Sequence, residues 1–354
     1  MKKLLCLLLV LCLVLPLTGC RNDDPQVTTT TAPTSTASQQ LKGLPLRVGV
    51  LYPGKVTEEN TGSYATHKEL LTALDQLDLD KAKDVIVQEL VPELTAKVGE
   101  AVDQLVEAGA TIIFGTALGY SEGMSQAANK YPDVIFCQMG GTNGNNGNFV
   151  TYFAPLYYAY FMTGAAAAVK AMELGTEAIG FISTSGKDHP EAAAIINAFA
   201  RGVQVFLPSA TVYLRVLETG ATEATETEAV DDLYQLKDCQ VFGAYTHTAG
   251  TLKQAYALKL FASGPWFPAT KLDPDPKDGH NALLVAPQVQ WRSFFLAALS
   301  AVEQCHSADD FPRYWILPIT ISTLATLALR ITEAMKMFGC PVWAAAAPPK
   351  QAHS

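Results

Sequence analysis

Residues 46–54 read Leu-Arg-Val-Gly-Val-Leu-Tyr-Pro-Gly, a short apolar strand that ends in a Pro-Gly turn. Similar apolar runs recur along the chain, at residues 85–87, 111–114, 134–137, 178–182, 212–217, 240–244 and 282–285. Because the runs are apolar without alternation, they are typical of strands that are buried on both faces. The chain is therefore expected to contain parallel sheets covered by helices.

Two segments between these strands carry the periodicity of helices. Val98, Ala101, Val102 and Leu105 recur at i, i+3, i+4 and i+7, which places them on one face of a helix. A second helix is predicted to open at Pro190, since proline is a favoured first helical residue. Its apolar face comprises Ile195, Ile196, Phe199, Val203 and Phe206. Strands that alternate with helices predict an α/β fold, and eight strands suit two sheets better than one.

The composition excludes two broad classes of protein. Of the 354 residues, 49% are hydrophobic and 17% are charged, so the chain is expected to fold around a core rather than stay disordered. The formal net charge of −9 is the wrong sign for a surface that neutralises phosphates. No nucleic-acid partner is expected.

The N-terminus predicts export and attachment to a membrane. Lys2 and Lys3 precede an apolar run over residues 4–15 that is typical of a secretory signal and too short to span a bilayer. The following Leu17-Thr18-Gly19-Cys20 resembles a bacterial lipobox, so residues 1–19 are predicted to be removed and Cys20 to be lipidated. The Thr/Ser/Pro-rich residues 20–44 are predicted to be a flexible tether on the extracytoplasmic face of the cell membrane.

The remaining cysteines and histidines predict no metal centre. Beyond the signal and the lipidated residue, Cys137, Cys239, Cys305 and Cys340 are widely spaced and form no C-x-x-C pair. The six histidines show no H-E-x-x-H motif. We predict no metal and no cofactor.

Motifs of catalysis are also missing from the sequence. It has no P-loop and no G-x-S-x-G elbow, and the Gly/Asn run at 140–148, which leads into a strand-like segment, differs from G-x-G-x-x-G and is interpreted as a loop. Asp273, Asp275 and Asp278 faintly resemble a calcium loop, but two prolines interrupt them. The chain is therefore predicted not to be an enzyme, with an exported nucleoside hydrolase as a remaining alternative because triads are set by geometry.

Polar and aromatic residues follow several predicted strands. They lie at 62–67 after the first strand, at 115–120 after the third, at 246–248 and at 287–291. Ligands of open parallel sheets bind beyond the carboxyl ends of strands, and aromatic faces with a few directional polar groups are typical of small-molecule clefts. These segments predict a binding site for a small molecule.

Several pieces of the sequence, in order and spacing, resemble one family. The pieces are Gly62 to His67, Ile112-Ile113-Phe114-Gly115-Thr116 with Gly119-Tyr120, Tyr131-Pro132-Asp133-Val134, Thr151-Tyr152-Phe153 with Gly164, Pro190-Glu191 with Ile196-Asn197-Ala198-Phe199 and Gly202, and Pro287 with Trp291. From about Leu46 to Phe295 the chain resembles the basic membrane protein (BMP/PnrA-like) substrate-binding lipoproteins of ABC importers, in particular their Med-like branch.

The resemblance implies a fold and a function. It implies a periplasmic-binding-protein type I fold with two α/β lobes, each with a mostly parallel sheet, and a ligand cleft between them. It also implies capture of a nucleoside, chiefly a purine nucleoside, and delivery to an ABC transporter permease. A lipoprotein of the same fold that senses or scaffolds at the membrane is the alternative, and a receptor for sugars or peptides is another.

We hypothesise that Tyr64 and Trp291 sandwich a planar base, and that Ser63, His67, Thr116 and His247 hydrogen-bond its edges. The full predicted ligand-binding set is Ser63, Tyr64, His67, Thr116, Gly140, Tyr157, His247, Asp273 and Trp291. Asp273 is the candidate for holding ribose hydroxyls.

Three segments depart from the family's pattern. Tyr158 and Tyr160 replace an acidic and a basic residue, Thr219-Gly220 replace a tryptophan, and Ala249-Gly250 stand where an aspartate is expected. These departures bear on which nucleoside is bound.

The domain organisation follows from the same reasoning. Residues 45–153 and 284–310 are predicted to form lobe 1, and residues 154–283 and 311–340 to form lobe 2. Within the latter, 316–329 is expected to be a buried helix or strand, and 341–354 is an unassigned tail.

Overall fold

The computed structural model describes residues 45–323, except 142–143, 145–146, 187, 218–221, 313 and 317–318. Several predictions concern residues outside this set: the signal peptide at 1–19, the lipidated Cys20, the tether at 20–44, Thr219-Gly220, Cys340 and the tail at 341–354.

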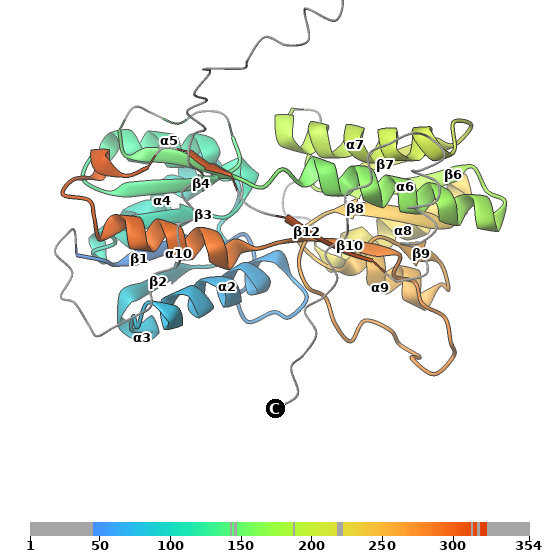
Figure 1. The fold of residues 1–354 in the computed structure, drawn as a ribbon, viewed down its shortest axis with the longest axis horizontal. Coiled ribbons are helices and arrows are strands. Elements are labelled where there is room, and N and C mark those ends of the chain that lie inside the picture. Colours follow the sequence, from blue (N-terminus) through green and yellow to red (C-terminus); the bar gives the residue numbers. More distant parts are fainter. Residues whose placement is uncertain are drawn as a thin grey trace, which may run out of the picture. The chain divides into compact units, whose positions relative to one another are not determined.

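The first sheet has six parallel strands in the order β11-β5-β4-β3-β1-β2 (Figure 1). The strands are β1 (Val48–Leu51), β2 (Val85–Gln88), β3 (Ile112–Gly115), β4 (Ile135–Met139), β5 (Phe149–Phe153) and β11 (Tyr314–Ile316). The four strands predicted from residues 46 to 137 are thereby confirmed. Every residue of β1, β3 and β4 is buried, as unbroken apolar runs require.

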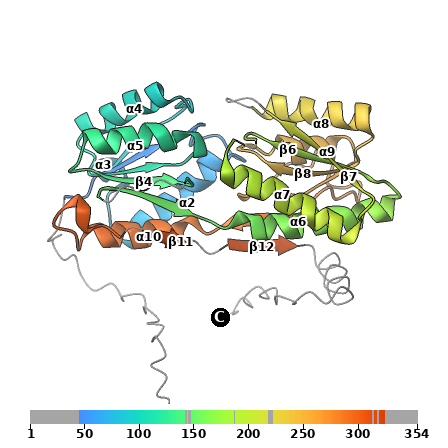
Figure 2. The same cartoon turned by 90° about the horizontal axis from the view of Figure 1, so that it is seen from above.

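Helices cover both faces of this sheet (Figure 2). One face packs against α2 (Gly62–Gln76) and α10 (Trp291–Val302), and the other against α4 (Thr95–Glu107) and α5 (Ser121–Lys130). The buried residues of α4 are the four predicted from periodicity, which confirms that helix and its orientation. The short α3 (Lys81–Asp84) and the 3₁₀ turn η1 (Leu118–Tyr120) complete this region.

The second sheet has four parallel strands in the order β7-β6-β8-β9. They are β6 (Ala178–Ser183), β7 (Thr211–Val216), β8 (Val241–Tyr245) and β9 (Phe261–Ala262). The helices α6 (Leu156–Leu174) and α7 (Pro190–Phe206) lie on one face, and α8 (Glu223–Lys237) and α9 (Gly250–Ala257) on the other. The helix predicted to open at Pro190 is confirmed.

Two glycines bring α6 and α7 into close contact. A Cβ atom on Gly164 would collide with the Phe199 carbonyl, and one on Gly202 with the Phe161 carbonyl. The two helices therefore approach backbone to backbone, which fixes the position of the α7 N-terminus beside the strand ends of the second sheet.

The last predicted strand is wrong in its bounds. It is β10 (Val285–Val289) rather than 282–285, so Pro287, Gln288 and Val289 lie within the strand instead of after it. The apolar run continues from Ala282 to Val289, and periodicity alone does not mark where pairing begins. Pro287 is tolerated because β10 belongs to a two-stranded antiparallel ladder with β12 (Ile319–Thr323).

The described part of 316–329 comprises Ile316, the last residue of β11, and the strand β12, whereas the sequence predicts a buried helix or strand there. β11 pairs with β5 in the first sheet, although the sequence assigns residues 311–340 to lobe 2. The lobe boundaries stay predictions. No helix in the part of the chain that the structure describes has the length and hydropathy of a membrane span.

Candidate functional site

Two of the predicted site segments meet through their backbones. Gly62, the first residue of α2, donates its N–H to the His247 carbonyl at 2.9 Å. Its neighbour Thr61 caps the helix and forms an antiparallel bridge with Thr248. The segment that opens α2, after β1 of the first sheet, and the turn after β8 of the second sheet are therefore joined. Ser63 is buried in this junction.

Trp266 forms an aromatic wall beside this junction. Its ring lies edge-on to His247 and to Trp291, with 6.1 Å between centroids in both cases, and its Nε1–H donates to the Thr246 carbonyl at 2.9 Å. A Cβ on Gly62 would stand 2.6 Å from the Trp266 ring, so only glycine allows this approach. Sequence reasoning missed Trp266 because β9, four residues before it, is only two residues long.

Trp291 is buried at the start of α10, and its ring lies edge-on to Tyr152 at 5.7 Å. Among the described aromatic residues, Tyr152 and Trp266 flank Trp291. Tyr64 is half-buried, and Lys68 Nζ lies 5.1 Å from the centroid of its ring. The sandwich of Tyr64 and Trp291 stays a prediction, and Trp266 is an aromatic surface nearer to Trp291.

His67, in α2, contacts the residue that follows β1, and Thr116 directly follows β3. His67 Nδ1 is 3.2 Å from the Tyr52 hydroxyl, and burial lowers the pKa of His67, with Glu89 opposing the shift. The buried Thr116 donates its hydroxyl proton to the Leu51 carbonyl at 2.6 Å. Its oxygen keeps lone pairs that can still accept a hydrogen bond.

His247 is held as a neutral ring. Burial lowers the pKa of His247, and the nearby Glu93 opposes this shift. Glu93 itself accepts the Gly119 N–H at 2.7 Å, which anchors its carboxylate beside η1. A neutral imidazole offers one donor and one acceptor, so His247 suits an uncharged polar partner.

Glu191 brings a buried carboxyl group to the predicted Gly140. It lies in the first turn of α7, behind Pro190, and its Oε2 atom is buried without a hydrogen-bond partner among the described residues. Gly140 has φ +67°, and a Cβ there would collide with Glu191 and with Leu118. Burial raises the pKa of Glu191 to about 7. In the sequence, Glu191 belongs to one of the pieces that resemble the family and follows a helix-opening proline, but it was not predicted as a ligand-binding residue.

The described residues contain four buried side-chain polar atoms without a partner, and three of them belong to residues at or just after the end of a strand. They are Gln138 Oε1, Glu191 Oε2, Ser263 Oγ and Trp291 Nε1. Gln138 is the last residue but one of β4, Ser263 follows β9, Trp291 follows β10, and Glu191 opens the helix after β6. Unsatisfied buried groups are rare in native proteins, so each of these atoms is a candidate for contact with a ligand.

The turn that carries His247 is supported by a second buried carboxyl group. Glu226 Oε1 accepts the Thr248 hydroxyl at 2.6 Å, and Oε2 accepts the Thr251 N–H at 3.1 Å. Burial raises the pKa of Glu226 to about 7, against the lowering effect of these hydrogen bonds. Glu226 thus positions the turn rather than facing open space.

Tyr157 and Tyr158 lie in the first turn of α6, where Tyr157 stacks on Phe153 at 6.0 Å and Tyr158 is exposed. Tyr160, the second departure in this helix, is fully buried and donates its hydroxyl proton to the Ala244 carbonyl at 2.7 Å. It therefore ties α6 to β8 instead of replacing a charged ligand contact.

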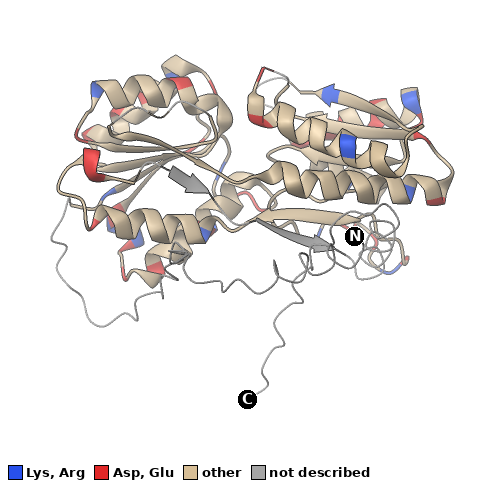
Figure 3. Cartoon of the chain, turned by 45° about the horizontal axis from the view of Figure 1, so that its top comes forward, with Lys and Arg blue, Asp and Glu red and all other residues tan. Residues whose placement is uncertain are grey.

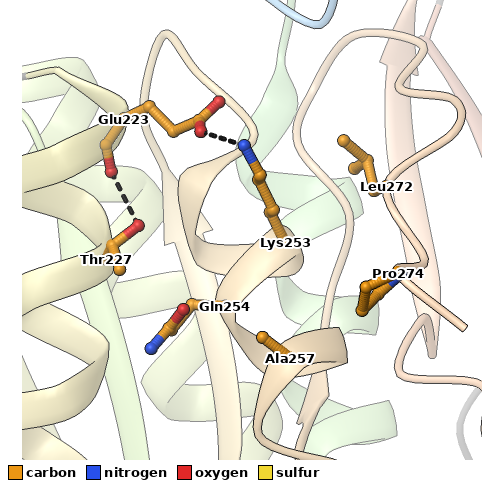
Figure 4. Close-up of a pocket in the computed structure, with 7 residues that line it drawn as sticks. All are labelled: Glu223, Thr227, Lys253, Gln254, Ala257, Leu272 and Pro274. Atoms are coloured by element: carbon orange, nitrogen blue, oxygen red, sulfur yellow. Dashed lines mark hydrogen bonds and ion pairs between the residues drawn. The ribbon is translucent and has the colours of Figure 1, made fainter.

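Asp273 is not brought together with the other predicted residues by any described contact. Its Oδ1 accepts the Asp275 N–H at 2.9 Å within its own loop. The flanking Leu272 and Pro274 line a separate surface pocket of about 330 Å³ beside α8 and α9 (Figure 4). Two residues that line this pocket, Lys253 and Glu223, form an ion pair at 2.5 Å, as the close-up shows.

Charge is spread over the molecule, and the described part offers no metal site. Figure 3 shows Lys and Arg interspersed with Asp and Glu along the helices of both sheets. Within the described ranges, no group of three or more His, Cys, Asp or Glu is arranged to hold a metal ion.

Comparison with known proteins gives matches at the level of family and of fold. A family model described as ABC transporter substrate-binding protein, PnrA-like, matches residues 46–259. A Haloferax volcanii protein, named provisionally as an ABC transporter glucose-binding protein, is 25% identical over 210 residues, which are 59% of this chain and 50% of that protein. A purine-binding protein of Brucella abortus is 24% identical over 260 residues, 73% of this chain and 69% of that protein. The chain thus spans only half the length of the first relative.

A solved structure of an ABC transporter solute-binding protein from Conexibacter woesei superimposes with a TM-score of 0.56 at 16% identity, covering 83% of this chain and 96% of that chain. This likeness shows the fold. It confirms the predicted class, an α/β fold of two parallel sheets as in type I periplasmic binding proteins.

Proposed function

The chain belongs to the PnrA-like family of ABC transporter substrate-binding proteins, and from this membership we propose that it captures a purine nucleoside or base for an ABC importer. Members of this family are substrate-binding proteins rather than enzymes, and they work on the extracytoplasmic side of the membrane. The identity of the ligand and of the transporter is the proposed part.

The four buried, unpartnered polar atoms carry the proposal. Leaving such an atom unsatisfied costs about 1–3 kcal/mol, which a ligand with complementary groups recovers on binding. One of these atoms belongs to Trp291, and the rings of Trp291 and Trp266 supply flat apolar surfaces. Aromatic faces together with a few unpaired polar groups suit a planar heterocycle.

The electrostatics of the site favour an uncharged ligand. Glu93 and Glu191 bring carboxyl groups to the site, while burial disfavours the cationic forms of His67 and His247. A phosphate or carboxylate ligand would meet these groups without a matching cation among the contacts described. We therefore propose a nucleoside or base rather than a nucleotide.

Two relatives bear on the class of ligand. The Brucella abortus relative is named for purine binding, which supports a purine. The Haloferax volcanii relative is named provisionally for glucose, so a monosaccharide is the second candidate, since sugars also stack on aromatic faces and bind through hydroxyl groups.

We also propose that residues 1–19 are removed and that Cys20 is lipidated, so that the tether at 20–44 holds the protein at the membrane. Metabolic labelling with a palmitate analogue tests this, because label should disappear in Cys20→Ser and persist in the wild type. A sensing or scaffolding role without an importer remains the alternative. It predicts that deletion of the gene leaves nucleoside uptake unchanged.

Calorimetric titration of the purified protein tests the ligand. Bound ligand is first stripped by unfolding and refolding, and the panel comprises adenosine, guanosine, inosine, cytidine, uridine, free purine bases, ribose and glucose. Saturable one-to-one binding of purine nucleosides or bases, recovered intact, is expected. Binding of glucose alone would replace the purine with the second candidate, and silence across the panel from folded protein would refute both.

A further inference from the structure

Glu191 is the strongest unexplained group in the molecule. Its Oε2 atom is buried against the backbone of Gly140, from the opposite sheet, and has no hydrogen-bond partner among the described residues. None of the ion pairs in the described residues includes Glu191. A glutamate that served only to favour the α7 N-terminus would lie exposed at the helix end, as Glu122 does in the first turn of α5.

The groups that face Glu191 are uncharged or acidic. Two of them are tyrosines, Tyr152 on β5 and Tyr245 at the end of β8. Burial raises the pKa of both, and the Glu191 charge adds to this effect. Glu93 also raises the pKa of Tyr245. Leu118, in η1, is apolar, and His189 is the N-cap residue of α7. Among the described residues, no positive group lies against a Glu191 carboxylate, so a ligand group can supply the contact that stabilises it.

The neighbours of Tyr152 place this atom in the ligand site. Trp291 lies edge-on to Tyr152. Among the four buried polar atoms without a partner, the indole Nε1–H of Trp291 is the one donor that points in a fixed direction. Glu191 Oε2 is an acceptor. A ligand that reaches both atoms therefore presents an acceptor to the indole and, when Glu191 is ionised, an N–H donor to its carboxylate.

We propose that Glu191 is a specificity-determining residue that binds the N–H edge of an oxopurine ring, such as that of guanine or hypoxanthine, and releases its proton on binding. This inference rests on the proposed function and deepens it. An oxopurine has an N1–H donor beside its carbonyl acceptor and can pair with the carboxylate. Adenine has an unprotonated N1 that can pair only with the protonated acid, so its binding would hold the proton on Glu191 instead of releasing it. The proton balance is simple: the neutral carboxyl group gives its proton to the buffer, and the resulting carboxylate accepts the ligand N–H.

The raised pKa of Glu191, about 7, makes this exchange measurable at neutral pH. At a pH equal to the pKa, half of the free protein carries the proton, so about half a proton is released for each ligand bound. Isothermal titration of guanosine at pH 7 in buffers of different ionisation enthalpy reads this number directly, because each released proton adds the buffer's heat.

The variant Glu191→Gln keeps the shape of the side chain and removes its titration. We expect guanosine to bind roughly 10- to 100-fold more weakly, because a hydrogen bond to a charged group is lost, and we expect proton release to fall to zero. Glu122→Gln is the matched control, a first-turn glutamate of a helix whose exposed side chain lies outside the site. It should retain both the affinity and the proton release.

A second measurement needs no variant of the protein. The probe 1-methylguanosine lacks the N1–H and should bind the wild type more weakly than guanosine, without proton release. Equal binding of guanosine to Glu191→Gln and wild type, or binding without proton release, would overturn the inference and leave nucleoside capture standing. Failure of the folded wild type to bind any nucleoside or base would overturn the proposed function and the inference with it.

Discussion

Replacing Glu226 with glutamine should flatten the pH dependence of folding stability between pH 5 and pH 8. Glu226 is fully buried on α8, and its burial raises its pKa from 4.5 to about 7 despite hydrogen bonds from Thr248 and Thr251. In this pH range the folded state holds a proton that the unfolded state has already lost. The free energy of unfolding therefore falls as the pH rises from the unfolded pKa to the folded one.

The magnitude follows from the shift. A difference of about 2.5 pKa units at about 1.36 kcal/mol per unit limits the effect to roughly 3.4 kcal/mol, of which about 2.5 kcal/mol falls between pH 5 and pH 8. Glutamine carries no proton to lose, so the stability of Glu226→Gln relative to wild type should improve by about 2.5 kcal/mol across this interval. In the variant, the amide NH₂ group replaces one carboxylate oxygen and faces a backbone N–H, so an acceptor is lost. This loss costs about 1–3 kcal/mol at every pH and leaves the pH-dependent difference in stability unchanged.

Urea unfolding of both proteins at pH 5 and pH 8 measures the effect. Comparison with wild type cancels the opposite trend of His67 and His247, whose lowered pKa values make stability rise with pH. The exposed Glu228, also on α8, supplies a control for loss of one negative charge through Glu228→Gln. A relative stability of Glu226→Gln that is constant, or that worsens toward pH 8, would refute the reasoning, since the hydrogen bonds would then outweigh burial.

Three further variants test the site and its support. Trp291→Ala should weaken nucleoside binding by roughly 5- to 150-fold in a titration, because base–aromatic stacking is worth about 1–3 kcal/mol, and an unchanged affinity in folded protein would remove Trp291 from the site. Gly140→Ala, at φ +67°, should lower the melting temperature through about 1–2 kcal/mol of backbone strain and displace Glu191; a wild-type melting curve would contradict this. Tyr160→Phe should cost about 1 kcal/mol in urea unfolding, since the hydroxyl bond to Ala244 is lost, and equal stability would show that water replaces that bond.

Local pattern was sufficient for the elements that build the sheets. The buried face of α4 and the start of α7 at Pro190 are both as predicted, because each depends on residues within one or two helical turns. The bounds of β10 were missed because pairing with β12 is a contact across about 30 residues, and such pairing leaves no mark in a local apolar run.

The site was predictable only in outline. The segments at 62–67 and 246–248 were predicted because polar residues follow strands there, and a backbone hydrogen bond between Gly62 and His247 joins them. Trp266 and Glu191 were not, since their significance depends on burial against residues from distant segments, Gly62 and Gly140. Asp273 was selected for its chemistry alone, and its described hydrogen bond is to its own loop.

The junction between Gly62 and His247 has a consequence for how such a receptor can change over evolutionary time. The bond joins a backbone N–H to a backbone carbonyl, so it does not depend on the chemistry of either side chain. Neighbouring side chains can be exchanged while the junction persists, provided that glycine is kept where Trp266 approaches. Descendants of one ancestral protein can thus acquire different ligands without losing the contact between their two halves.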